Sequence, residues 1–218
     1  MIKQDEIDNL VHEYFKKEWT FIEEGRRPVF PNIITHRFDE YSSAVLYSFV
    51  RKFRPQIILE IGTYEGGATN VIMQALKKNQ DHNITFVASE LDNDRKCKTA
   101  VNLWNLTKRM PIMIGDITKN LFFVPNELDM LFIDTDHDLE TTQWIYKHIL
   151  PRVKRGGFIV MHDWAVIEVK GQWVAKEGAW PETEYIIKLH EKGELPLKPL
   201  FWTYKNPHNY ETGFWLKL

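Results

Sequence analysis

The sequence lacks the features that mark a secreted or membrane-spanning chain. Among 218 residues there is one cysteine, Cys97, so an intramolecular disulfide is excluded. The first residues, MIKQDEIDNL, carry charges and amides where a secretory signal needs an apolar stretch. No uninterrupted apolar run approaches the ~20 residues that a membrane-spanning helix requires. We therefore expect a cytoplasmic protein that has no membrane partner.

Neither sign of charge is in large excess. Thirty Asp and Glu residues against 28 Lys and Arg give a formal net charge of −2. Because attraction to nucleic acids or anionic lipids needs a basic excess, we expect neither as a partner. The chain does have 44% hydrophobic residues over a length that supports one sizeable core. This composition favours a single α/β domain.

The pattern of apolar residues changes along the chain. Residues 4–24 and 39–53 each have the periodicity of an amphipathic helix. Beyond them, short apolar runs typical of buried strands alternate with helical segments. The expected strands are QIILEIG (56–62), NITFVASEL (83–91), MPIMIGD (110–116), LDMLFID (128–134) and GGFIVMHD (156–163). The expected helices between them cover residues 66–79, 93–107 and 138–153.

This alternation predicts a parallel sheet with right-handed crossovers. The aromatic-rich segments 197–205 and 209–218 read as a C-terminal antiparallel hairpin. We therefore expect a Rossmann-like, doubly wound α/β fold with a mostly parallel seven-stranded sheet and helices on both faces. Residues 1–218 would form one domain, with a helical cap (1–54), a cofactor-binding core (55–165), and a lid loop, helix and hairpin (166–218). The N-terminal helix could cover the pocket or form a homo-oligomer interface.

The stretch LEIGTYEGGAT (59–69) ends a strand-like run in one acid and three glycines. Tyr64 replaces the second glycine of a dinucleotide fingerprint, and no lysine follows Gly67 as a P-loop requires. Glu60 would repel a pyrophosphate but suits a ligand with a cationic amine. S-adenosylmethionine carries an ammonium and a sulfonium and no phosphate, so it is the candidate ligand. The alternative is a tight turn that binds nothing.

The next two strand ends extend this prediction. Glu90 ends the segment 83–91, where α/β folds hydrogen-bond the hydroxyls of an adenosine ribose. Asp92 competes for the same role, and its other reading is a helix N-cap. Asp116 ends the segment 110–116 and could accept from the adenine amino group, or could simply cap the next segment of the chain.

Acids and histidines gather after the fourth and fifth strands. The carboxyl ends of parallel strands share one edge, which would bring Asp134, His162 and Asp163 beside the glycine turn. Acids packed together raise one another's pKa unless a cation lies among them. Carboxylate oxygens with one imidazole suit Mg²⁺ or Mn²⁺, so we predict these three residues as metal ligands. Asp136 and Asp138 could instead be N-caps, and His162 a core histidine.

His137 lies three residues after Asp134 and could face a substrate held at the metal. Imidazole has an unperturbed pKa of about 6.5 and can accept a hydroxyl proton at neutral pH. We therefore predict His137 as the catalytic general base. The alternative is a histidine that caps its neighbours.

With these motifs in view, residues 56–165 resemble class I S-adenosylmethionine-dependent methyltransferases. The likeness lies in LEIGTYEGGAT, ASELDND, GDI, DMLFIDTDHDLETT and LPRVKRGGFIVMHDW. It is strongest to small-molecule O-methyltransferases related to macrolide-sugar methyltransferases and to the group named after cephalosporin hydroxylase. The resemblance implies a turn that surrounds the methionine end of the cofactor, formed by Glu60, Gly62, Thr63, Gly66 and Gly67.

The resemblance also implies Glu90 at the ribose, metal at Asp134 and Asp163, and a base at His137. We count Tyr64 of the turn, Asp116 and Asp134 among the cofactor residues as well. In the sugar methyltransferases an acidic ligand tends to stand at the position of His162.

The segment 164–180 carries Trp164, Trp173 and Trp180 beside glycines. Such a segment could form a lid that stacks on an acceptor ring, or its aromatic residues could pack it onto the domain.

We therefore expect a metal-assisted O-methyltransferase that acts on a small hydroxylated acceptor, such as a glycosyl or phenolic group. In one alternative, methyl transfer needs no metal and the acids serve only cofactor binding and capping. A non-heme iron oxygenase would need two histidines and a carboxylate, which His137, His162 and Asp134 could supply. A third alternative is a non-catalytic sensor or scaffold that binds S-adenosylmethionine.

Overall fold

The computed structural model describes residues 2–16, 40–63, 66–80, 84–91, 112–164, 166–169, 172–175, 179–203 and 212–218. The strands are β1 (Ile57–Ile61), β2 (Thr85–Glu90), β3 (Ile112–Ile114), β4 (Leu128–Ile133), β5 (Val153–Met161), β6 (Val166–Val169), β7 (Gln172–Ala175), β8 (Leu197–Thr203) and β9 (Thr212–Lys217). The helices are α1 (Gln4–Val11), α2 (Glu40–Phe53), α3 (Gly67–Asn79), α5 (Leu139–His148) and α6 (Pro181–Glu191). Short helical turns are η1 (His12–Lys16), η4 (Ile117–Lys119), η5 (Leu121–Phe123) and η6 (Leu150–Arg152).

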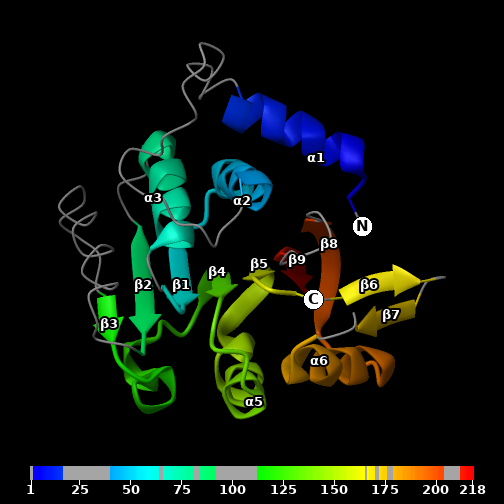
Figure 1. Ribbon diagram of the computed structural model, residues 1–218. Coiled ribbons are helices and arrows are strands. Elements are labelled where there is room, and N and C mark those ends of the chain that lie inside the picture. Colours follow the sequence, from blue (N-terminus) through cyan, green and yellow to red (C-terminus); the bar gives the residue numbers. More distant parts are fainter. Residues whose placement is uncertain are drawn as a thin grey trace.

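Seven of the described strands form one sheet in the order β3-β2-β1-β4-β5-β9-β8. The strands from β3 to β5 in this order are parallel, and β9 is antiparallel to both of its neighbours. Helices α1, α2 and α3 lie on one face of this sheet, and α5 and α6 lie on the other (Figure 1). The Rossmann-like α/β fold and the C-terminal antiparallel hairpin are therefore confirmed.

The central strands β1 and β4 are mostly apolar because each of their faces is covered. Along β1, Ile58 packs into the cluster beneath α1, α2 and α3, whereas Leu59 and Ile61 pack into the cluster beneath α5 and α6. Successive side chains of a strand point to opposite faces, so a strand buried on both sides needs a continuous apolar run. None of the helices within the described ranges is long and apolar enough to cross a membrane.

The N-terminal segment differs from the prediction of one helix over residues 4–24. Helix α1 ends at Val11 and continues as the single π-helical turn η1 to Lys16. Ile7, Val11 and Phe15 are nonetheless buried, so the amphipathic pattern expected for this segment holds as far as Phe15. The later part of that prediction and the expected helix over 93–107 lie outside the described residues.

The segment after β5 contains regular structure where a lid loop was predicted. Strands β6 and β7 pair antiparallel as a separate two-stranded sheet. Trp173 on β7 is buried, stacks on His190 of α6 at 3.5 Å between ring centroids, and meets Trp164 and Trp215 edge-on. Trp164 and Trp173 therefore pack this segment onto the domain, as the alternative reading held. Trp180 is different, because 43% of it is exposed.

Candidate active site

The candidate site lies where β1, β2, β4 and β5 reach their carboxyl ends. Backbone hydrogen bonds continue between neighbouring strands for one residue past the strand ends, so the residues just beyond the strands lie side by side. These bonds run from Gly62 N to Ser89 O (2.8 Å), from Asp134 N to Ile61 O (2.8 Å) and from His162 N to Ile133 O (2.9 Å). The sheet thus brings together the ends of the predicted strands, as open parallel sheets do at ligand sites.

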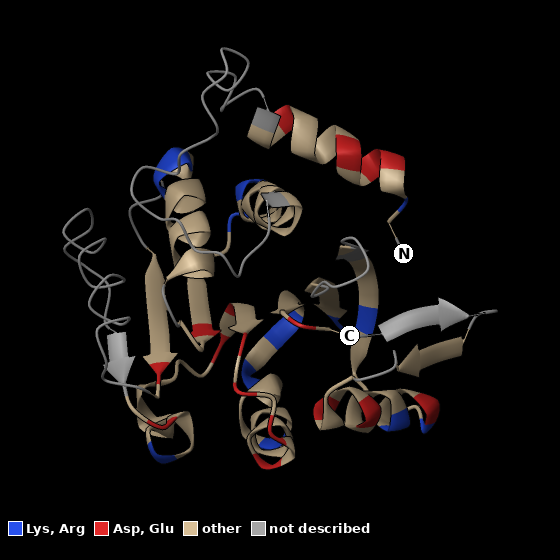
Figure 2. Cartoon of the chain, viewed as in Figure 1, with Lys and Arg blue, Asp and Glu red and all other residues tan. Residues whose placement is uncertain are grey.

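A cleft of about 950 Å³ opens at this edge. Acidic residues line it, and Figure 2 shows acids at the end of β2 and along the connection from β4 to α5. The acids that line the cleft are Glu90, Asp116, Asp134, Asp136, Asp138, Glu140 and Asp163. No lysine or arginine is among the described residues that line it. Such a cleft attracts cationic groups and repels phosphates.

The glycine turn after β1 is shaped by its contact with β4. Gly62 has a φ of +83°, and a Cβ built on it would lie 1.7 Å from the carbonyl oxygen of Asp134. Only glycine fits this backbone approach. Gly66, also at positive φ, is the N-cap of α3, and Gly67 is the first residue of that helix. Tyr64 lies outside the described residues.

Glu60 is buried behind the turn and does not line the cleft. Its Oε1 accepts a hydrogen bond from Thr69 Oγ1 at 2.9 Å, and no group of the described residues hydrogen-bonds its Oε2. Burial raises the pKa of Glu60 to about 8, with Asp134 and Glu90 acting in the same direction against the bond from Thr69. The attraction of a cationic amine by Glu60 requires an ionised carboxylate, and this role stays a prediction.

Glu90 joins the end of β2 to the glycine turn. Its Oε2 accepts from the backbone N–H of Thr63 at 2.9 Å and from Thr63 Oγ1 at 3.0 Å. Glu90 also lines the cleft, whereas Thr63 is buried beneath it. The competing candidate, Asp92, lies outside the described residues. The two hydrogen bonds from Thr63 hold the Glu90 carboxylate at the cleft, where the predicted ribose contact would be made.

Asp116 fulfils its capping role and still faces the cleft. Its Oδ1 accepts from Thr118 Oγ1 at 2.6 Å and from Thr118 N at 2.9 Å, which caps η4. The hydrogen bond from Thr118 and the Lys119 ammonium at 3.1 Å hold the pKa of Asp116 below its usual range. Asp116 therefore remains a hydrogen-bond acceptor on the wall of the cleft.

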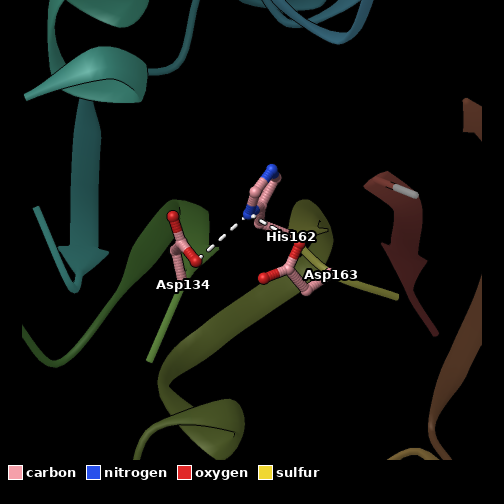
Figure 3. Close-up of side chains that lie close together, drawn as sticks. All are labelled: Asp134, His162 and Asp163. Carbon is pink, nitrogen blue, oxygen red and sulfur yellow. Dashed lines mark hydrogen bonds and ion pairs between the residues drawn. The ribbon is translucent and has the colours of Figure 1, made fainter. Parts of the chain in front are cut away.

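The three predicted metal ligands lie close together (Figure 3), and all three line the cleft. His162 Nδ1 lies 3.2 Å from Asp134 Oδ1 and 3.3 Å from Asp163 Oδ1. One ligand atom from each residue lies within 4.8 Å of the others, which is close enough for all three to contact one ion. Asp134 follows β4, and His162 and Asp163 follow β5, so the parallel pairing of these two strands forms the group.

His137 lies between two carboxylates. Its Nδ1 is 2.7 Å from Glu182 Oε1, and its Nε2 is 2.9 Å from Asp163 Oδ2. Burial alone would lower the pKa of His137, but the hydrogen bonds to Asp163 and Glu182 outweigh it and raise the pKa to about 10. A general base needs an available ring nitrogen and a pKa near neutrality, and His137 has neither. Carboxylates engage both ring nitrogens, so the base role of His137 stays a prediction that this arrangement does not support.

The backbone at this point is strained. His137 and Asp163 are two of the four described non-glycine residues with positive φ, at 63° and 55°. Such conformations cost on the order of 1–3 kcal/mol each and gather at functional sites, where surrounding contacts hold them. Trp180 stacks on the His137 ring at 4.8 Å with an angle of 9° between the rings, and it lines the cleft.

Asp138, one of the acids expected as an N-cap, has that role. Its Oδ1 accepts from Thr141 N at 2.7 Å and caps α5. Sequence reasoning missed Glu182, which stands 45 residues after His137 in the first turn of α6. The sequence signal available was Pro181, because proline followed by an acid is favoured at the start of a helix. This signal predicts where α6 begins but not that Glu182 contacts His137.

Comparisons with known proteins bear on the fold of this chain. Residues 59–164 match a family model described as a methyltransferase domain, while no curated protein matches the sequence. An O-methyltransferase from Bacillus cereus in complex with SAH has a similar structure, with a TM-score of 0.65 and 16% identity over 95% of this chain and 100% of that one.

Two further solved structures cover nearly the whole chain. The SAH-bound methyltransferase PaMTH1 of Podospora anserina has a TM-score of 0.60 at 13% identity, over 98% of this chain and 94% of that one. The O-methyltransferase TomG of Streptomyces achromogenes, involved in tomaymycin synthesis and in complex with SAM, has a TM-score of 0.58 at 16% identity, over 100% and 92%. The solved structures show that this chain has the fold of these methyltransferases, and the methyltransferase-domain match covers residues 59–164.

Proposed function

We propose that the protein is an S-adenosylmethionine-dependent O-methyltransferase that acts on a small hydroxylated acceptor, glycosyl or phenolic, with the help of a divalent cation. One observation carries this proposal. Within the methyltransferase domain, an acid-lined cleft holds an Asp134–His162–Asp163 group at the carboxyl edge of the sheet. The acids also argue against a nucleic-acid substrate, whose phosphates they would repel.

The part of the cleft between β1, β2 and β3 suits the methyl donor. Glu90 faces the cleft from the end of β2, where it would hydrogen-bond ribose hydroxyls, and Asp116 would accept from the adenine amino group. Similar structures were solved with SAM or SAH, the product of methyl transfer. A donor with a sulfonium and an ammonium also matches the excess of acids.

The Asp134–His162–Asp163 group fits a divalent cation by its chemistry. Two carboxylates and one imidazole are ligands that Mn²⁺ accepts readily and Mg²⁺ accepts chiefly through the oxygens. When bound, such a cation would lower the pKa of an acceptor hydroxyl and fix its position. The chain itself orients the three side chains through the adjacent ends of β4 and β5.

The acceptor would occupy the part of the cleft nearest α5 and α6. Trp144 of α5 and Trp180 before α6 both line the cleft. Aromatic faces of this kind bind sugar or phenol rings by stacking. Alignment of the acceptor with the donor would supply much of the rate.

Isothermal titration calorimetry with S-adenosylmethionine and S-adenosylhomocysteine, with and without Mn²⁺, tests the proposal. We expect both to bind, and we expect Asp134→Asn to weaken Mn²⁺ binding at least about tenfold and to lower methyl transfer to hydroxyl acceptors. Glu140→Gln is the matched control, because it removes an acid of the same cleft that is not part of the Asp–His–Asp group.

Several outcomes would contradict parts of the proposal. A protein that binds NADH and neither adenosyl ligand would exclude the methyl donor. Methyl transfer that EDTA leaves unchanged would remove the cation and favour the metal-independent alternative. Tight donor binding without transfer to any acceptor of a broad panel would favour a sensor or scaffold.

A further inference from the structure

A chain of alternating acids and imidazoles runs from α6 to the end of β4. Glu182 contacts His137 Nδ1 at 2.7 Å, and His137 Nε2 contacts Asp163 Oδ2 at 2.9 Å. Beyond Asp163, His162 and Asp134 complete the candidate cation site. Of these five side chains, Asp163, His162 and Asp134 can contact one ion together. Glu182 and His137 therefore contact the candidate cation site from outside it.

The contacts of His137 fix its ring on three sides. Carboxylates lie at both nitrogens, and the indole of Trp180 covers one face of the ring. His137 and Asp163 also share the left-handed backbone conformation, which is rare for residues with side chains. Because His137 is held so tightly, its ring can fix the orientation of the Asp163 carboxylate that it contacts.

Stability does not account for this arrangement. Side chains of His137, Asp163 and Glu182 are each only 11–14% exposed. Taking such charged groups out of water is unfavourable, and apolar residues of the same size often serve stability equally well. The Oε2 of Glu182 is also buried without a hydrogen-bond partner among the described residues. The arrangement therefore indicates a task at the neighbouring site.

We propose that Glu182 is a positioning residue of the cation site and acts through His137. Its carboxylate orients the imidazole of His137, and His137 in turn fixes Oδ2 of Asp163, which leaves Oδ1 of Asp163 facing His162. Partners behind metal ligands commonly hold ligand orientation in this way. The inference rests on the cation binding proposed above, and it makes α6 part of the machinery of a site built on β4 and β5.

The test measures the affinity of the full-length chain for Mn²⁺ alone, from the electron paramagnetic resonance signal of the unbound ion. We expect Glu182→Ala to weaken Mn²⁺ binding about 10- to 100-fold. Glu182→Gln should restore most of the affinity, because its amide oxygen can still accept from Nδ1. Glu184→Ala is the matched control: Glu184 lies in the same turn of α6 and faces Lys188 on the surface, so affinity should stay within about twofold.

A double-mutant cycle shows whether the effect passes through His137. In a His137→Ala background, Glu182→Ala should change Mn²⁺ affinity by less than about twofold, because the link is already broken. Circular dichroism of each variant checks that it is folded. If Glu182→Ala does not fold, Glu182→Asp replaces it, since its shorter side chain withdraws the carboxylate from Nδ1.

The outcomes separate this inference from the proposed function. A wild-type chain that binds Mn²⁺ and a Glu182→Ala variant that binds it equally well would overturn the positioning role and leave the cation site standing. Equal losses in Glu182→Gln and Glu182→Ala would show an effect of charge through space and would also overturn it. A wild-type chain that binds no Mn²⁺ would remove the cation site and the inference together.

Discussion

The carboxyl groups on the two sides of the cleft have different kinds of hydrogen-bond partner. Around the glycine turn, the carboxyl groups of Glu60 and Glu90 accept hydrogen bonds from neutral donors, the hydroxyl of Thr69 and the amide and hydroxyl of Thr63. On the β4–β5 side, acids face the two imidazoles of His137 and His162, and both His137 and Asp163 have strained backbones. The first side is a frame of hydrogen bonds that joins β1, the turn, β2 and α3. The second holds an excess of negative charge, as a cation-binding site does.

The two sides meet at Gly62, so a change there should have the largest effect. In Gly62→Ala the new Cβ would collide with the carbonyl oxygen of Asp134, and the residue would have to keep a φ of +83°. We expect the free energy of unfolding to fall by more than about 3 kcal/mol, measured by urea denaturation. Gly156→Ala is the control, since Gly156 has a φ of +80° with no atom within 4 Å of its Cβ position. It should cost only about 1 kcal/mol, and equal losses would refute the role of the contact.

The charged side should make stability depend on pH. The pKa of His137 is raised from 6.5 to about 10 in the folded protein, so its contribution is complete below pH 6.5 and is lost as the pH rises toward 10. Between pH 8 and 9 we expect the free energy of unfolding of the metal-free protein to fall about 1.4 kcal/mol further per pH unit than in His137→Gln. Parallel pH profiles for the two proteins would show that His137 is not protonated in the fold.

The stability of the glycine-turn side should depend on hydrogen bonds to neutral donors, such as the bond from Thr69 to Glu60, and not on charge. Thr69→Val removes the donor to Glu60 and should cost about 1–2 kcal/mol of unfolding free energy, measured by thermal denaturation. Glu60→Gln is the matched variant: a carboxyl with a pKa near 8 is protonated at pH 7, and an amide of the same shape still accepts from Thr69. We expect it to keep stability within about 1 kcal/mol and to leave donor affinity unchanged. A large loss of donor affinity would show that Glu60 acts as an anion after all.

The smallest effect on stability should come from Trp180→Ala. Because 43% of Trp180 is exposed, we expect a change in unfolding free energy of under about 0.5 kcal/mol. The variant should raise the KM for the acceptor and leave the dissociation constant of S-adenosylmethionine unchanged, because Trp180 lies on the α6 side of the cleft. If the variant instead lost affinity for S-adenosylmethionine, the methyl donor would bind on the α6 side of the cleft, which contradicts the proposed arrangement.

The frame could be predicted from the sequence because its signals are local. Apolar runs identified β1, β4 and β5, and the rule that parallel strands share a carboxyl edge correctly brought Asp134, His162 and Asp163 together. The capping role of Asp138 likewise needs only the residues beside it. In each case the partner is either a few residues away or fixed by the strand order.

The remaining features depend on contacts that no local pattern encodes. The double hydrogen bonding of His137 requires α6 to begin beside it, and the position of a helix after a long connection follows from packing. Glu60 is buried because α3 packs against it, as the hydrogen bond from Thr69 shows, and the acid motif gives no sign of that packing. The hairpin of β6 and β7 was missed because glycines favour a loop, although Trp173 packs it against α6.

Strand β9 enters the sheet between β5 and the earlier strand β8. During synthesis, β8 leaves the ribosome first but has no place in the sheet until β9 has paired with β5. The edge of the sheet is therefore assembled last and in reverse of the chain order, from contacts between segments far apart in sequence. Until β9 has paired, this flank of β5 has no neighbouring strand, and unpaired strand edges make a folding chain prone to aggregation.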